Sequence, residues 1–167
     1  RFTGKTKAEL LWEAHMLLNS RKTEKSRTLF HAPSKEYKLP DLDRNRIEDA
    51  YDEIELLGFP VSINWFGLVK TSFRGDISAN DMKGMNGHRI RMVGHLVTVK
   101  YIKTVNRQWM NFGCFIDHKG QFFDTVHFSD SLAKYPFRGS GTYLMLGKVT
   151  EDFGFHQLEV EKWQNWK

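Results

Sequence analysis

The chain has 167 residues, of which 40% are hydrophobic and 27% are charged, and its formal net charge at pH 7 is +5. This composition is ordinary for a soluble globular protein with a core, and no apolar run approaches the roughly 18 residues that a membrane span requires. The single cysteine, Cys114, excludes an internal disulfide, so we expect a reducing cytoplasm and a small buried thiol. Because the chain begins at Arg1 rather than Met and enters a helical pattern within a few residues, we expect a piece of a longer protein.

The N-terminal part predicts a helix followed by an extended linker. Apolar residues recur at three- and four-residue spacing over residues 8–18, which predicts a helix, and Thr6 and Glu9 can cap its start. Residues 19–40 are rich in Ser, Thr, Lys and Arg, contain two prolines and show no period. We therefore expect a linker there.

A second helix and two short turns are predicted next. Apolar residues share one face over residues 45–57, and Gly58 is a natural terminator for this helix. Residues 64–70 and 78–85 each predict a short helical turn.

From residue 87 onward the sequence changes to strand-like runs rich in Val, Ile, Thr and Phe. Gly94 lies inside the first run, where a glycine often marks a bulge or a bend. Five strands, a long bent first one and a helix after the third describe an OB-fold Greek-key barrel, although turn spacing alone also permits a small sandwich. The predicted strands are residues 88–103, 109–117, 121–128, 142–151 and 155–163, with a helix over residues 129–135. We expect a mostly β fold with an α-helical N-terminal part: a helical and extended tether over residues 1–86, and an OB-fold domain over residues 87–167.

No group of residues has the spacing of a catalytic or metal site. Residues 4–6, Gly-Lys-Thr, lack the earlier glycine and the strand of a phosphate-binding loop. Asp41 and Asp43 stand where aspartate caps a helix, not on a rigid strand that could fix metal ions. The seven histidines form no metal-ligand pattern, and His127 with its nearby serines lacks a nucleophile elbow. We expect no cofactor, no metal and no catalytic residue in this chain.

Charge is segregated along the sequence. Between Met82 and Ile116 there are six basic residues and no Asp or Glu, whereas Glu48–Glu55 holds five acids and no Lys or Arg. The basic block coincides with strand-like sequence, which fits either a solvated basic face of a sheet or a nucleic-acid surface.

An OB barrel binds single strands with the face of its second and third strands and with the loops at its rim. Three basic residues fall at the end of the first predicted strand and in the following loop, which is a rim position, and three aromatic residues lie beside them. We expect the rings to stack on bases and the cations to follow phosphates. Arg91 joins them if its side chain faces outward. The predicted nucleic-acid-binding residues are Arg91, Lys100, Tyr101, Lys103, Arg107, Trp109 and Phe112.

The second predicted strand leaves two face assignments open, because both of its faces are partly apolar. Core filling and base stacking are equally good interpretations of Trp109 and Phe112, whereas Phe122, Phe123 and Phe128 are expected mainly in the core. The two candidate faces are Trp109, Asn111, Gly113 and Phe115, and Met110, Phe112, Cys114 and Ile116.

Five segments carry a resemblance to a known family: ELLWEA (9–14), DAYDEIELLGFPVS (49–62), RMVGHLVTVKYIKT (91–104), MNFGCFIDHKGQFFDTVHF (110–128) and GTYLMLGKVTEDFGFHQLEVEK (141–162). With these segments, most of the chain resembles the C-terminal region of bacterial DNA polymerase III alpha subunits. The matching segments follow one another in the family's order. They are the helix with its Leu-Gly-Phe-Pro segment, the glycine-containing first strand, the second and third strands, and the last two strands. The sequence departs from the family at Cys114, where Thr is common, and at Ile116, where Glu is common. If that Glu position faces solvent, Phe112 is exposed and Phe115 is in the core.

The resemblance implies a role in DNA replication, with single-stranded template binding and no nucleotidyl transfer in this piece, because nothing here matches the family's catalytic carboxylates. Other replication subunits, such as the parent polymerase domains, the clamp or the clamp loader, are possible partners, and no membrane is expected. The rival hypothesis is a protein–protein interaction module, since a basic barrel face can also meet an acidic subunit.

Overall fold

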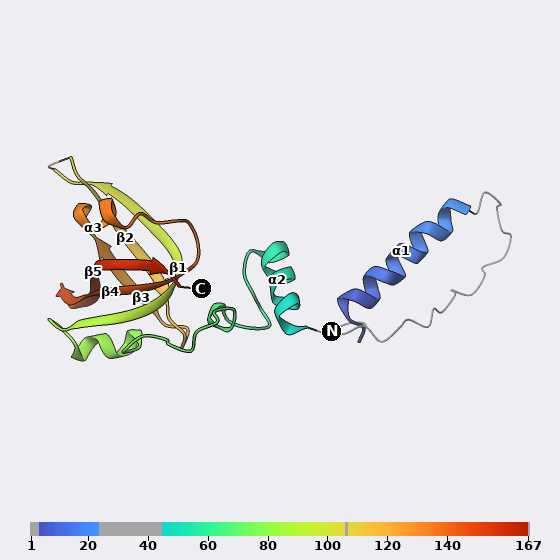
Figure 1. Cartoon of the computed structure of the whole chain (residues 1–167), viewed down its shortest axis with the longest axis horizontal. Coiled ribbons are helices and arrows are strands. Elements are labelled where there is room, and N and C mark those ends of the chain that lie inside the picture. The colour runs from blue at the N-terminus through green and yellow to red at the C-terminus, as the bar shows by residue number, and fades with distance from the viewer. Residues whose placement is uncertain (1–3, 24–44, 106, 167) are drawn as a thin grey trace. The chain divides into compact units, whose positions relative to one another are not determined.

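The computed structural model describes residues 4–23, 45–105 and 107–166. They belong to two compact units that divide the chain between Arg46 and Ile47. The first holds helix α1 (Lys7–Thr23), and the second holds nearly all of helix α2 (Arg46–Leu57) together with a β-barrel (Figure 1). No helix in these described ranges is long and apolar enough to cross a membrane.

Helix α1 begins with the capping box that the sequence predicts. The Thr6 N–H donates to Glu9 Oε2 at 2.5 Å, and the Glu9 N–H donates to Thr6 Oγ1 at 3.3 Å. Two N–H groups that a helix start leaves unpaired are thereby satisfied. The linker start expected at residue 19 is wrong, because the helix continues through Arg and Lys, which are good helix formers, to Thr23. The rest of the predicted linker lies outside the described residues.

Helix α2 ends at Leu57, and Gly58 follows in the left-handed region with φ +84°. The Gly58 N–H donates back to a carbonyl of the last helical turn at 2.9 Å. The Glu53 carboxylate then accepts hydrogen bonds from the N–H groups of Ser62 at 2.8 Å and Val61 at 2.6 Å. These bonds hold the pKa of Glu53 below its ordinary value and fix the turn that ends the helix.

The two predicted turns are short 3-10 helices, η1 (Trp65–Gly67) and η2 (Ala79–Gly84). The Ala79 N–H donates to the Asp117 carboxylate at 2.9 Å, which ties η2 to the distant turn after the second strand. Met82 of η2 is 2% exposed and belongs to the hydrophobic core of the barrel. The segment before the first strand is therefore part of the folded barrel unit.

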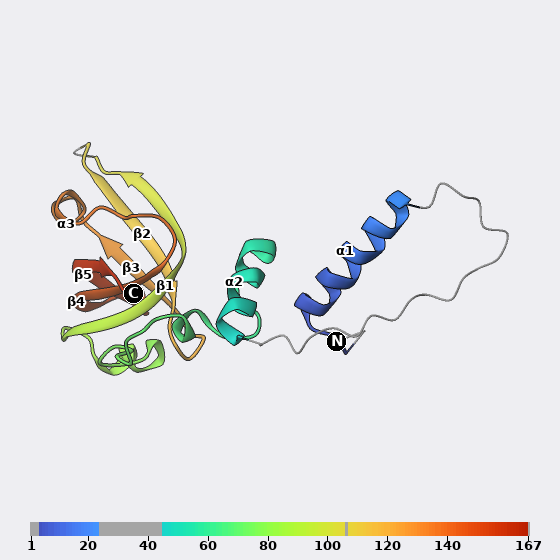
Figure 2. The ribbon, with the colours of Figure 1, turned by 45° about the vertical axis from the view of Figure 1, so that its right-hand side comes forward.

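Five strands close into a barrel in the order β1-β2-β3-β5-β4, with β4 returning to β1 (Figure 2). β3 and β5 run parallel, and the other four pairs are antiparallel. This order, with a helix between β3 and β4, confirms the OB-fold-like Greek-key barrel predicted from the sequence. The elements are β1 (Arg89–Lys103), β2 (Trp109–Ile116), β3 (Phe122–His127), α3 (Ser129–Lys134), β4 (Thr142–Asp152) and β5 (Phe155–Asn165).

Strand β1 pairs with two neighbouring strands because it curves near its middle (Figure 2). Up to His95 it pairs with β4, and from His95 onward it pairs with β2. A Cβ atom at Gly94 would lie 2.6 Å from the Phe123 ring and 2.9 Å from Phe115 Cβ. The glycine predicted to mark a bend is therefore required by close packing at the point where β1 changes partners.

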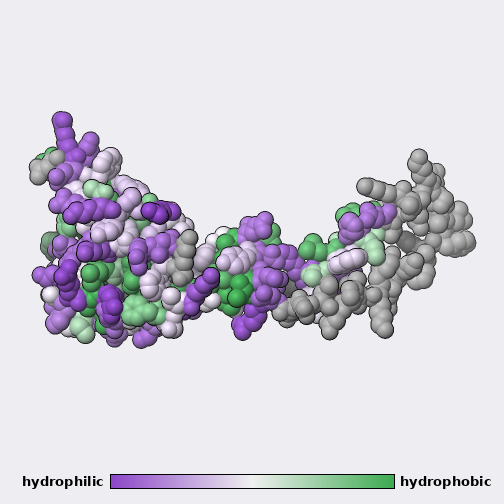
Figure 3. Space-filling model, viewed as in Figure 1, coloured by the Kyte–Doolittle hydropathy of each residue, from purple (hydrophilic) through white to green (hydrophobic). Residues whose placement is uncertain are grey.

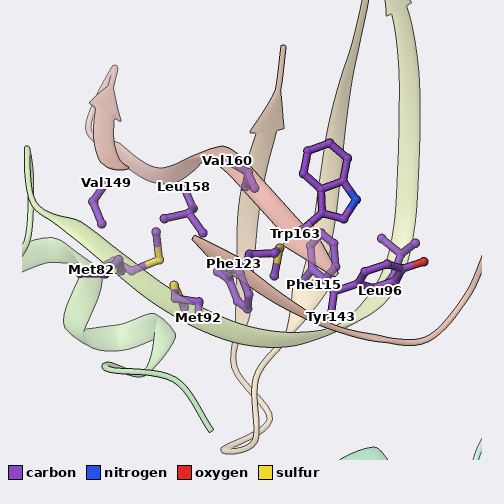
Figure 4. Packing of buried hydrophobic residues seen from close by; sticks show 12 residues of the cluster. Met82, Met92, Leu96, Phe115, Phe123, Tyr143, Val149, Leu158, Val160 and Trp163 are labelled. Atoms are coloured by element: carbon purple, nitrogen blue, oxygen red, sulfur yellow. The ribbon is translucent and has the colours of Figure 1, made fainter. Parts of the chain in front are cut away.

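The barrel interior is filled by side chains from all five strands (Figure 4). Phe115 of β2 is fully buried, with ring centroids 5.7 Å from Phe123 and 6.2 Å from Tyr143. Aromatic pairs at these separations contribute beyond the area that they bury. The core therefore centres on Phe115.

Two histidines of the barrel strands are buried as neutral rings. His127 Nε2 lies 2.9 Å from Thr125 Oγ1, and its ring centroid is 4.5 Å from that of Trp163. Burial lowers the pKa of His127 to about 3. The ring of His95 stacks on Trp65 at 3.9 Å between centroids, and burial lowers its pKa to about 4. His127 is thus a core residue.

Acid is expected to destabilise the barrel through these two histidines. Their pKa values in the folded state lie below the ordinary value of 6.5, so the unfolded chain takes up protons first as the pH falls. The free energy of unfolding is therefore highest above about pH 6.5. It declines by up to ~1.4 kcal/mol per pH unit for each histidine, down to about pH 4 for His95 and about pH 3 for His127. Urea unfolding of wild type and His127→Gln at pH 7 and pH 5 checks this, with a smaller pH dependence expected for the variant. An equal free energy of unfolding of the wild type at both pH values would contradict it.

Candidate nucleic-acid interface

The barrel places Phe112 on its outside and Phe115 on its inside. Lys100 of β1, Phe112 of β2 and Val126 of β3 form one row across three strands. Phe112 is 37% exposed, whereas Phe115 is 0% exposed. The face assignment that strand periodicity left open is therefore the one that the resemblance implied.

The expectation that Phe122 and Phe128 fill the core is wrong. Phe122 is 63% exposed and Phe128 is 44% exposed, while Phe123 is buried as expected. Alternate residues of a strand point to opposite sides, so an inward Phe123 turns Phe122 outward, opposite Ile116 of β2. Phe128 lies beyond the end of β3, where it is the N-cap residue of α3. Phe122 thus joins Phe112 on the outer face.

The outer face of β2 and β3 is not uniformly basic. Asp124 of β3 lies opposite Cys114 of β2, and Glu159 of β5 lies opposite Val126. Burial and a hydrogen bond to the Asp124 carboxylate raise the pKa of the Cys114 thiol. Cys114, expected to be buried, is only partly so, and it remains a neutral thiol and a poor nucleophile. Acidic groups therefore lie at the β3 and β5 side of this face.

The ends of β1 and β2 form an arm, residues 100–105 and 107–112, most of which extends past the other strands (Figure 1). β1 pairs with β4 only up to His95, and β2 pairs with β3 only from Asn111. The Thr104 N–H donates to the Gln108 carbonyl at 2.8 Å and closes the turn. Figure 3 shows a mostly hydrophilic surface at the tip of this arm. The arm thus exposes side chains on both of its faces.

The predicted contact residues are divided between the two faces of the arm. Lys100 and Phe112 are paired on one face. Tyr101, Lys103 and Trp109 belong to the other, where Lys103 Nζ lies 5.8 Å from the centroid of the Trp109 ring. Tyr101 is 57% exposed and Trp109 is 56% exposed, so neither fills the core. Each face of the arm therefore combines a cation with an exposed ring.

The arm's positive charge is not neutralised within the described part of the chain. Lys100, Lys103 and Arg107 form no ion pair with any described residue. Arg107 lies in the turn with φ 61°, a conformation that is uncommon outside glycine. Cations are thus available on both faces and at the tip.

Arg91 is not brought together with the other predicted residues. It lies in the first half of β1, opposite Leu146 of β4. Its Nη2 lies 2.7 Å from Asp76 Oδ1, and its guanidinium is 4.8 Å from the centroid of the Phe73 ring. The hydrogen bonds and charge of Arg91 hold the pKa of Asp76 below its ordinary value. The charge of Arg91 is therefore balanced by Asp76, at a position away from the arm.

Two exposed rings that were not among the predicted contact residues lie around the β4–β5 turn. Phe153 is 95% exposed with φ 49°, and Phe155 is 79% exposed. β5 runs parallel to β3 with Gln157 opposite Asp124, so this turn lies at the end of β3 that carries Phe122. An Asp-Phe-Gly-Phe sequence, with a ring on each side of the turn glycine, was the available signal.

The candidate interface offers cations and rings and no metal-binding cluster. Within residues 4–23, 45–105 and 107–166, no three His, Cys, Asp or Glu side chains are grouped to hold a metal ion. Comparison of the chain with models of known protein families and with curated proteins finds no match.

Proposed function

We propose that the barrel binds single-stranded DNA along the β1–β2 arm and the outer face of β2 and β3, without chemistry on the strand. The observation that carries this proposal is the pairing of cations with exposed rings: Lys100 opposite Phe112, and Lys103 beside Trp109. An exposed ring stacks on any base, and a neighbouring ammonium group meets the flanking phosphate. In an OB-type barrel this face and its rim are the usual place for a single strand.

The charges on the outer face favour one path for the bound DNA strand. Asp124 and Glu159 repel phosphates from the β3 and β5 side, whereas Lys100, Lys103 and Arg107 attract them to the arm. The sugar–phosphate backbone then follows the arm, with bases turned toward the ring of Phe112 and its neighbours.

The resemblance to the C-terminal region of bacterial DNA polymerase III alpha subunits supports a template-binding role in cytoplasmic DNA replication. In this proposal the strand is held for a polymerase whose catalytic residues lie elsewhere, and other replication subunits are partners. The rival, a protein-interaction module, predicts capture of such a subunit without affinity for DNA.

Salt dependence of binding tests the proposal. For single strands, log affinity falls by about 0.7 per neutralised phosphate for each unit of log salt, so three cations predict about a 20-fold loss from about 50 to about 200 mM salt. Fluorescence anisotropy of a labelled oligothymidine, with a duplex of equal length as comparison, measures this. Tighter binding to the single strand is expected. The absence of single-strand binding at low salt, or a preference for the duplex, would contradict the proposal.

Phe112→Ala is expected to weaken binding of the oligothymidine by about 1–3 kcal/mol, the value of one stacked base. Phe112 is exposed, so the barrel should keep its stability. Phe59→Ala, which removes another exposed ring outside the barrel strands, is the matched control and should leave affinity unchanged. Equal affinities of the Phe112 variant and the control would exclude stacking at Phe112.

A further inference from the structure

A groove of about 700 Å³ opens along β4, β5 and residues 134–138. Arg91, Leu146 and Lys162 line it as a row across β1, β4 and β5. β4 pairs only with β1 and β5, so the groove lies on a different side of the barrel from the β2 and β3 face. The proposed DNA interface therefore leaves this groove unassigned.

The groove is strongly positive. Lys134, Arg138 and Lys162 line it, and none of them forms an ion pair with any residue that the structure describes. Arg91 also lines it but is matched by Asp76. No Asp or Glu is among the lining residues. The groove is thus suited to an anionic ligand.

Part of the surface between these cations is aliphatic. Leu144, Leu146 and Pro136 line the groove, and the first two are only partly buried. Trp163 also lines it, is 5% exposed, and has an indole N–H without a hydrogen-bond partner among the described residues. Exposed rings suit bases, whereas leucine and proline side chains suit aliphatic groups. The lining therefore favours a ligand with carboxylates and aliphatic side chains.

Strand β5 has an unpaired edge beside the groove. Its ladder with β3 ends at His127 opposite Val160, whereas its ladder with β4 continues to Asn165. Within the described part of the chain, no backbone hydrogen bond joins residues 162–165 to residues 134–138. Such an edge can pair with an extended peptide.

We propose that this groove binds an extended acidic peptide segment of a partner protein. The carboxylates of the peptide meet Lys134, Arg138 and Lys162, and an apolar side chain packs on Leu144 and Leu146. Charge complementarity selects an acidic ligand, and the aliphatic lining with its free strand edge selects a peptide over a nucleic acid. The proposal does not depend on DNA binding, because the two surfaces lie on different sides of the barrel.

The test uses the full chain and a short fluorescein-labelled peptide that alternates Glu with Leu. The groove reversal variant carries Lys134→Glu, Arg138→Glu and Lys162→Glu, and should bind the peptide on the order of tenfold more weakly or worse. A variant with three charge reversals on the β1–β2 arm is the matched control and should bind the peptide as the wild type does. A larger loss in the arm variant than in the groove variant would overturn the proposal.

Two further ligands distinguish a peptide groove from a general anion surface. An oligoglutamate peptide of equal charge without leucine should bind more weakly than the alternating peptide, and equal binding would overturn the role of the aliphatic lining. A labelled oligothymidine should bind the groove reversal variant as tightly as the wild type. Equal losses of DNA and peptide binding in that variant would instead make the groove part of the nucleic-acid path.

A measurement on the wild-type protein does not depend on how the variants fold. The Trp163 indole N–H signal should shift in NMR spectra as the alternating peptide is added, because Trp163 lines the groove. Trp163→Phe assigns that signal. A titration that leaves the Trp163 signal in place while other indole signals move would overturn the proposal.

Discussion

Phe115→Ala is expected to destabilise the barrel by about 3–5 kcal/mol. The Phe115 ring is 0% exposed and packs against Phe123, Phe137 and Tyr143 at centroid separations of 5.7 to 6.5 Å. Its removal loses the transfer free energy of the ring and leaves a cavity that closely packed neighbours cannot fill. Since small domains are stable by only about 5–15 kcal/mol, the variant is expected to unfold at much lower urea concentrations.

Phe122→Ala is the matched control for the core variant. Phe122 is 63% exposed on the adjacent strand, so its loss should change the free energy of unfolding by about 0.5 kcal/mol or less. Urea unfolding followed by circular dichroism compares the two variants. Similar losses in both, or a larger loss for Phe122→Ala, would show that the inward and outward faces are assigned wrongly.

The fold was predictable because local signals agreed with each other. The capping box at Thr6, the terminator Gly58 and the turn glycines mark where elements begin and end, and strand-like composition identifies all five strands. A special role for Gly94 was predictable, because a glycine inside a long strand usually marks a bulge, a bend or a close contact. The rings that require it, Phe115 and Phe123, come from two other strands and could not be identified from spacing.

The site was less predictable because exposure and charge partners depend on distant residues. Both faces of β2 are partly apolar, so period alone did not choose between Phe112 and Phe115. Arg91 was expected to join the arm if it faced outward, but its partner Asp76 lies 15 residues earlier in the chain and no local pattern links them. Phe122 was assigned to the core because it is apolar, although one of two adjacent phenylalanines in a strand must face outward.

Reversing the arm's charge is expected to abolish binding of single-stranded DNA. The arm reversal variant carries Lys100→Glu, Lys103→Glu and Arg107→Glu. Each substitution removes one phosphate contact and adds a carboxylate that repels the backbone, so affinity at low salt should fall by about two orders of magnitude or more. The three side chains are exposed and form no ion pair with described residues, so the barrel should remain folded.

The groove reversal variant supplies the control for net charge, because it loses the same formal charge from a different side of the barrel. A loss caused by overall charge would appear in both variants, whereas a loss caused by a local contact would appear only in the arm variant.

Single-strand binding by the arm is tested most directly by fluorescence anisotropy with one labelled oligothymidine at low salt. The affinities of the wild type, the arm reversal variant and the groove reversal variant are compared. Binding that is lost in the arm variant and kept in the groove variant is the expected result. Unchanged affinity in the arm variant, or the same loss in both, would contradict single-strand binding by the arm.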